Sequence, residues 1–197
     1  MVSDDNLALL EGDKIKYISA MDRNQIENIT QIDFAKYSYL LPEKIDEQVE
    51  TLPKFQKMNE NTFCREIKVD WQRRYILCFN PQLFKDQRKA REQALANFHL
   101  LASNLNAELL EAKNSRQEQP TYAKFQKKLE KAKLNNFADV ALIEKYVYPL
   151  VENENRKIRT YQAEVVVDDD KMLLAGKLDG FWLLVTNHSE KTDQEFT

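Results

Sequence analysis

The stretch Lys177–His188 reads KLDGFWLLVTNH, and it is the most strand-like core segment of the chain. Asp179-Gly180 is a turn signal. Five apolar residues follow it, and Thr-Asn-His ends the run. The pattern predicts a buried strand over 178–187. Two interpretations are open: the strand closes a finished domain, or further residues of the same domain follow it.

The composition is that of an ordinary globular protein. Hydrophobic residues make up 43% of the 197 residues and charged residues 31%. No apolar run reaches the length of a transmembrane helix, and the acidic N-terminus does not resemble a signal peptide. We therefore expect a cytoplasmic protein without membrane partners. Only three glycines occur, which excludes a P-loop and a dinucleotide-binding loop.

Periodicity and capping residues predict a mixture of helices and strands. Asn80-Pro81 is typical of a helix start, and a hairpin over 63–80 would bring Cys64 and Cys78 onto neighbouring strands. In a reducing cytosol we expect these two cysteines to be free thiols. The other expected elements are a helix over 6–11, a strand over 15–21, short helices within 23–60, helices over 81–113, 122–134 and 139–151, a strand over 156–167 and a short helix over 168–175.

Several acidic and histidine residues are candidates for chemistry, and each also has a simpler interpretation. Asp168–Asp170 offer three carboxylates to magnesium, but acids at a helix start are favoured by the dipole alone. Asp179 precedes an apolar strand, as carboxylates of magnesium nucleases do, yet Asp-Gly is a plain turn. His188 follows a strand end without a visible triad partner, and His99 flanks the apolar helix face. We assign no catalytic and no metal-binding residue.

A basic segment is the stronger candidate. Residues 113–133 contain seven basic residues against two acidic ones, although the whole chain has a net charge of −3. Lys124, Lys127, Lys128 and Lys131 crowd one side of the expected helix. Such a stripe can follow a phosphate backbone, whereas the alternative is a solvated helix face. The sequence predicts a DNA contact through these four lysines.

Three blocks of sequence together resemble bacterial insertion-sequence DDE transposases. MVSDDNLALLEGDKIKYISAM is similar to the segment after their second catalytic Asp. KLDGFWLLVTN matches their Asp-Gly strand that ends in Thr-Asn. The third block, RRYILCFNPQLFKDQRKAREQAL, is similar to their Arg-Tyr, apolar strand, Asn-Pro and helix, with matching positions Arg74, Tyr75, Asn80, Pro81, Asp86, Arg91, Glu92 and Leu95.

The resemblance implies an RNase H-like core and, for the full-length family, DNA cleavage and strand transfer by two magnesium ions held by carboxylates. It also implies that all three catalytic carboxylates lie outside residues 1–197. We therefore expect this chain to hold no cofactor and to be inactive alone. Whether it is an enzyme stays open.

The expected fold is α/β or α+β: a partial RNase H-like sheet with a large, mainly helical insertion that carries the hairpin. Residues 1–22 would begin the core, 23–155 would form the insertion, and 156–197 would return to the core. The expected function is that of a transposase fragment that binds transposon ends. The alternative is a non-catalytic regulatory protein that pairs with full-length transposase, with itself or with another partner.

Overall fold

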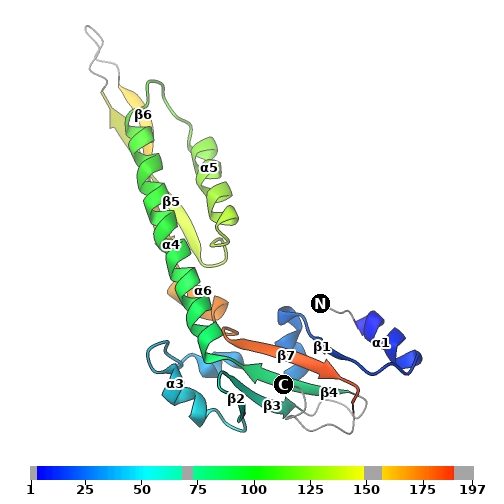
Figure 1. Cartoon of the computed structure of the whole chain (residues 1–197). Coiled ribbons are helices and arrows are strands. Elements are labelled where there is room, and N and C mark those ends of the chain that lie inside the picture. The colour runs from blue at the N-terminus through cyan, green and yellow to red at the C-terminus, as the bar shows by residue number, and fades with distance from the viewer. Residues whose placement is uncertain (1–3, 68–72, 149–156, 189–197) are drawn as a thin grey trace. The chain divides into compact units, whose positions relative to one another are not determined.

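The computed structural model describes residues 4–67, 73–148 and 157–188, and it shows a mixed α+β fold (Figure 1). The chain divides into two compact units. The first comprises residues 1–88 and 176–197, and the second comprises residues 89–175. The second unit is thus inserted into the first.

The first unit is built on a five-stranded antiparallel sheet in the order β1-β7-β4-β3-β2. Its central strand β4 pairs with β3 on one side and with β7 on the other. The hairpin expected within 63–80 and the last strand expected within 178–187 are therefore confirmed. The bounds are Ile18–Ala20 for β1, Gln56–Asn59 for β2, Thr62–Ile67 for β3, Arg74–Phe79 for β4 and Phe181–Thr186 for β7.

One face of this sheet carries the main core. Alternate residues of β4 and β7 point to the same side, and Leu77, Phe79 and Leu183 are fully buried there. The ring of Phe181 lies 4.6 Å from the ring of Phe79 and 5.1 Å from that of Phe34, measured between centroids. Short helices supply the opposing residues: α1 (Asp4–Gly12), α2 (Ile26–Thr30), η2 (Phe34–Tyr37), α3 (Ile45–Gln48) and η3 (Val49–Thr51). The short helix η1 (Arg23–Gln25) has no buried residue.

A tight corner places β7 against β4. Gly180 has a φ of 75°, in the left-handed region that favours glycine. A Cβ atom there would lie 2.7 Å from Cε2 of Phe79 and 2.8 Å from Cβ of Phe84. The backbone N–H of Asn80 donates to the Gly180 carbonyl at 2.9 Å, and the Gly180 N–H donates to Oε1 of Gln87 at 2.8 Å. Glycine is therefore favoured at position 180 over any residue with a Cβ atom, for both conformational and steric reasons.

The second unit consists of helices packed on a two-stranded ribbon. Helix α4 (Pro81–Leu110) enters this unit at Lys89, α5 is Glu118–Lys131, and α6 is Asp169–Ala175. Strands β5 (Ala138–Val147) and β6 (Ile158–Val167) pair along their whole length, and α4 runs beside them in Figure 1.

Two polar contacts anchor α4 to this ribbon. The Asn106 side chain bonds both the N–H and the carbonyl of Ala163 at 2.8 Å. The buried Thr160 hydroxyl donates to the Leu109 carbonyl at 2.7 Å. Around them Phe98, Phe125, Leu129 and Leu134 form a separate apolar core.

The start of α4 is the one expected from Asn80-Pro81, since the Asn80 side chain accepts a hydrogen bond from the Leu83 N–H at 2.9 Å. The helix expected over 139–151 is wrong for 139–147, because 138–147 form β5. Residues 149–151 of that expectation lie outside the described residues. The buried residues Ala138 and Val140 of β5 alternate with exposed ones, which is the period of a strand. Pairing with β6 over ten residues stabilises the strand conformation of this segment.

Other boundaries also differ. Helix α5 begins at Glu118 rather than at Tyr122, because Pro120 lies in its first turn, where a missing N–H costs nothing. Strand β2 was not expected, and the strand expected over 15–21 is shortened to β1. The expected insertion over 23–155 also differs from the observed division. The hairpin belongs to the first unit and β6 to the second, and the second unit runs from residue 89 to residue 175.

We predict that Gly180→Ala lowers the free energy of unfolding by about 3 kcal/mol, because the new methyl group meets two ring-bearing residues in a backbone conformation unfavourable for alanine. Urea unfolding followed by tryptophan fluorescence measures it. Gly12→Ala is the control. Nothing lies within 4 Å of a Cβ there, so alanine should leave stability unchanged or raise it by up to about 1 kcal/mol. Equal stability of the two variants would contradict the tight corner.

Candidate nucleic-acid interface

Helix α5 has a buried stripe and a basic flank. Thr121, Phe125 and Leu129 are buried at intervals of four residues, which places them on one face of the helix. Lys124, Lys127, Lys128 and Lys131 are all exposed. At about 100° per residue they share an arc of about 100° beside the buried stripe. The structure therefore brings the four predicted lysines together on one flank.

The other flank of α5 has a different character. The Tyr122 hydroxyl donates to Oδ1 of Asp139 at 3.0 Å, and the Gln126 amide contacts the same oxygen. The hydrogen bond to Asp139 raises the pKa of Tyr122. The carboxylate of Asp139 therefore lies on the flank of α5 away from the four lysines.

One of the four lysines has a carboxylate partner. Nζ of Lys124 lies 3.2 Å from Oε2 of Glu108 on α4, and both side chains are more than half exposed. Within residues 4–67, 73–148 and 157–188, Lys127, Lys128 and Lys131 form no ion pair. Two of them, Lys128 and Lys131, lie in the last helical turn, where a cation also favours the helix dipole. A structural role therefore accounts for part of the charge but not for Lys127.

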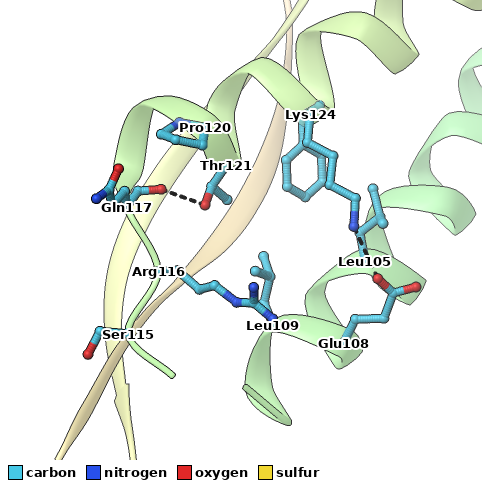
Figure 2. A pocket seen from close by; sticks show the side chains of 10 residues that line it. Leu105, Glu108, Leu109, Ser115, Arg116, Gln117, Pro120, Thr121 and Lys124 are labelled. Carbon is cyan, nitrogen blue, oxygen red and sulfur yellow. Dashed lines mark hydrogen bonds and ion pairs between the residues drawn. The ribbon is translucent and has the colours of Figure 1, made fainter. Parts of the chain in front are cut away.

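A cavity of about 370 Å³ opens beside this flank, between α4 and the start of α5 (Figure 2). Leu105, Leu109 and Phe125 give it an apolar floor. Arg116 and Lys124 bring two cations to it, against the single carboxylate of Glu108. Figure 2 shows the Arg116 side chain extending toward Leu109.

Arg116 is held in place by its backbone. Its N–H donates to the Arg159 carbonyl on β6 at 2.8 Å. The sequence placed Arg116 in the basic segment but gave no reason to single it out, because its place beside α5 depends on the loop that joins α4 to α5. The same is true of Glu108, whose pairing with Lys124 crosses from one helix to the next.

The triple Asp serves the start of α6. Oδ1 of Asp168 accepts the Lys171 N–H at 3.0 Å, and Oδ2 lies 3.0 Å from Nζ of Lys171. The backbone hydrogen bond from Lys171 is the main cause that lowers the pKa of Asp168. In the described parts of the chain, no group of three or more His, Cys, Asp or Glu side chains is placed to hold a metal ion.

Asp179 is a buried partner of two arginines. Its side chain is fully buried, and Oδ1 lies 3.2 Å from Nη2 of Arg23. Oδ2 lies 3.1 Å from Nε of Arg88, a charge contact without the alignment of a hydrogen bond. Arg88 also stacks on Phe84, at 4.9 Å from the ring centroid. The carboxylate therefore closes the corner before β7, in agreement with the turn interpretation.

The two histidines have separate surroundings. The His188 N–H donates to Oγ1 of Thr186 at 3.1 Å, and its carbonyl accepts from Nη1 of Arg74 at 3.4 Å. These are backbone contacts that end β7. His99 is exposed on α4.

A polar cluster that the sequence did not indicate joins α1 to the beginning of β4. Glu11 accepts two hydrogen bonds from Arg73, at 2.7 and 3.0 Å, and one from the Tyr17 hydroxyl at 2.6 Å. The bond from Arg73 is the main cause that lowers the pKa of Glu11, followed by the bond from Tyr17. Burial and the hydrogen bond to Glu11 raise the pKa of Tyr17.

Comparison of the chain with protein families, with curated proteins and with solved structures found no match in any of the three. Among the described residues, no helix has both the length and the apolar character needed to cross a membrane.

We predict that Asp179→Asn lowers the free energy of unfolding by about 2–3 kcal/mol, because two arginines lose a buried counter-charge. The value is reduced because the Arg23 side chain is 43% exposed. Asp46→Asn is the matched control, since Asp46 pairs with Lys85 on the surface and should cost less than about 1 kcal/mol. Urea unfolding measures both, and equal losses would show that Asp179 is no anchor.

The Glu11 cluster predicts that the free energy of unfolding falls at both low and high pH. Because folding lowers the pKa of Glu11, its contribution is present above the pKa of the unfolded chain and is lost as pH falls through the folded value. Because folding raises the pKa of Tyr17, its contribution is present below about pH 10 and is lost at higher pH. Unfolding curves between pH 3 and 11 measure this. Glu11→Gln should reduce the loss of stability at low pH and at high pH relative to the natural chain. An unchanged pH dependence would contradict the coupling between Glu11 and Tyr17.

Proposed function

We propose that this chain is the DNA-contacting part of a DDE transposase-like protein, and that the basic flank of α5 binds the phosphate backbone. The observation that carries the proposal is the gathering of Lys124, Lys127, Lys128 and Lys131 on one exposed arc of α5, beside the stripe that the helix buries. Cations at this spacing neutralise successive phosphates and release counterions from DNA.

The neighbourhood of α5 supports this function. Arg116 adds a further cation at the cavity beside Lys124. Lys127, the residue without a helix-dipole role, has no counter-charge among the described side chains. An exposed stripe of this kind supplies affinity without reading base sequence, because phosphates are the same at every step.

The transposase part of the proposal rests on the arrangement of the three similar blocks. They fall on β1 with α1, on β4 with the start of α4, and on β7. These strands are neighbours in the sheet, in the order β1-β7-β4. Segments far apart in the sequence thus share one sheet, as parts of a common catalytic scaffold would. An RNase H-like origin of this sheet belongs to the same proposal, as does magnesium for the full-length protein.

The regulatory alternative is favoured by a different observation. The second face of the sheet carries a small apolar cluster in which the buried Cys64, Ile76 and Cys78 pack with Met58, Trp182 and Leu184. All six lie on β2, β3, β4 or β7. Met58, Trp182 and Leu184 are partly exposed there, and they offer apolar surface to another polypeptide, including full-length transposase or a second copy of this chain.

Lys127→Glu combined with Lys128→Glu should weaken binding to a 20-bp duplex by about 10-fold or more at 50 mM salt. The slope of log K against log salt should fall by about 2, because two phosphate contacts are removed. Fluorescence anisotropy of labelled duplex at several salt concentrations measures both quantities.

The matched control is Lys36→Glu with Lys44→Glu, which makes the same charge change at exposed lysines of the first unit. Its affinity should stay within about 3-fold of that of the natural chain, since only long-range charge is altered. Equal weakening by both double variants would contradict a specific α5 surface. Absence of duplex binding, together with a dimer in sedimentation, would favour the regulatory alternative.

A further inference from the structure

Cys64 and Cys78 face each other in the hairpin of β3 and β4. They are direct partners in the antiparallel register, and their Sγ atoms lie 2.7 Å apart. A disulfide bond is about 2.05 Å long. The two sulfurs therefore need to approach by only about 0.7 Å to be bonded.

The surroundings of the two cysteines limit their other reactions. Cys64 is 5% exposed and Cys78 is 2% exposed. Each thiol is thus poorly placed to react with a cysteine of another protein chain but well placed to react with the other thiol. The outer neighbour of β3 is the four-residue strand β2, whose pairing is irregular between Lys57 and Asn59. Cys64 is the more exposed of the two residues and pairs with Gln56 on this short edge strand, so we take its sulfur as the one that an oxidant reaches first.

We propose that Cys64 and Cys78 are a reversible modification site that forms an intramolecular cross-strand disulfide with a low-molecular-weight disulfide as oxidant. The Cys64 thiolate attacks a sulfur of the oxidant, a mixed disulfide forms and one thiolate leaves. The Cys78 thiolate then attacks the Cys64 sulfur, the protein disulfide forms and the second thiolate leaves. Two cysteine protons are released, and the two electrons reduce the oxidant to two thiols.

The disulfide would link the central strand of the sheet covalently to its neighbour β3. β4 is the central strand, and it holds β7 and β1 on one side and β3 and β2 on the other. Oxidation adds a covalent link between β4 and β3 on the face opposite the main core, where the two cysteines form the small cluster with Ile76. The inference does not depend on DNA binding by α5.

Trp182 supplies a built-in reporter. It is the register partner of Cys78 on β7, so its indole belongs to the same face of the sheet. A disulfide quenches indole fluorescence on contact. Formation of the bond should therefore lower the emission of Trp182, and the Trp182→Phe variant, which keeps Trp71, should lose this response.

The experiment is incubation of the reduced full chain with glutathione disulfide, followed by intact-mass analysis and alkylation under denaturing conditions. The expected product has lost two hydrogen masses, carries no glutathione, takes up no alkylating reagent and returns to the dithiol with dithiothreitol. Its fluorescence should fall, and its thermal midpoint should rise by about 6–10 °C, because the cross-link closes a short loop in the unfolded chain.

Cys64→Ala and Cys78→Ala are the matched controls. Neither should lose two hydrogen masses, and each should show neither the fluorescence response nor the shift of the thermal midpoint. The mass and alkylation results for the natural chain decide the inference even if a variant fails to fold. Two alkylated cysteines after oxidation, a stable glutathione adduct on the natural chain, or a disulfide-linked dimer would each overturn it.

Discussion

The pairing of β4 with β7 is the constraint on which the first unit depends. The whole second unit lies between these two strands in the sequence, so their pairing must overcome the entropy of closing a long loop. The corner at Asp179-Gly180 makes the closure specific. Gly180 lets the backbone approach Phe79 and Phe84, and Asp179 holds Arg23 and Arg88. From this corner Phe181 enters the aromatic cluster, and the short helices of residues 23–51 pack over it.

The same corner explains why a carboxylate beside an apolar strand is ambiguous. An acid in this position suits both metal chemistry and a buried ion pair. In this protein Asp179 is enclosed with two guanidinium groups, so its charge is satisfied within the fold. Asp168 is similar, because its oxygens bond the first turn of α6. Both residues serve the ends of secondary-structure elements, and the cationic surface of α5 is left as the stronger candidate for function.

In the second unit, helix α5 carries its packing residues and its charged residues on different faces. Phe125 and Leu129 are fully buried, and this fixes the rotation of α5 on α4 and the ribbon. The same rotation directs the lysines toward solvent, since the spacing that buries the apolar residues exposes the basic ones. The proposed DNA contact follows from that rotation. It is strengthened by Arg116, which reaches the same cavity from the preceding loop.

The sequence by itself determined the elements whose information is local. Asn80-Pro81 caps α4, the alternation in 63–80 gives the hairpin with Cys64 opposite Cys78, and the lysine spacing gives one basic flank. Tertiary structure decided the rest. Residues 139–147 carry a pattern compatible with a helix or a strand, and only the ladder with β6 makes them β5. The partners of Asp179, Glu11 and Lys124 come from distant segments. No local pattern encodes them, because an ion pair depends on where the backbone has already brought its two side chains.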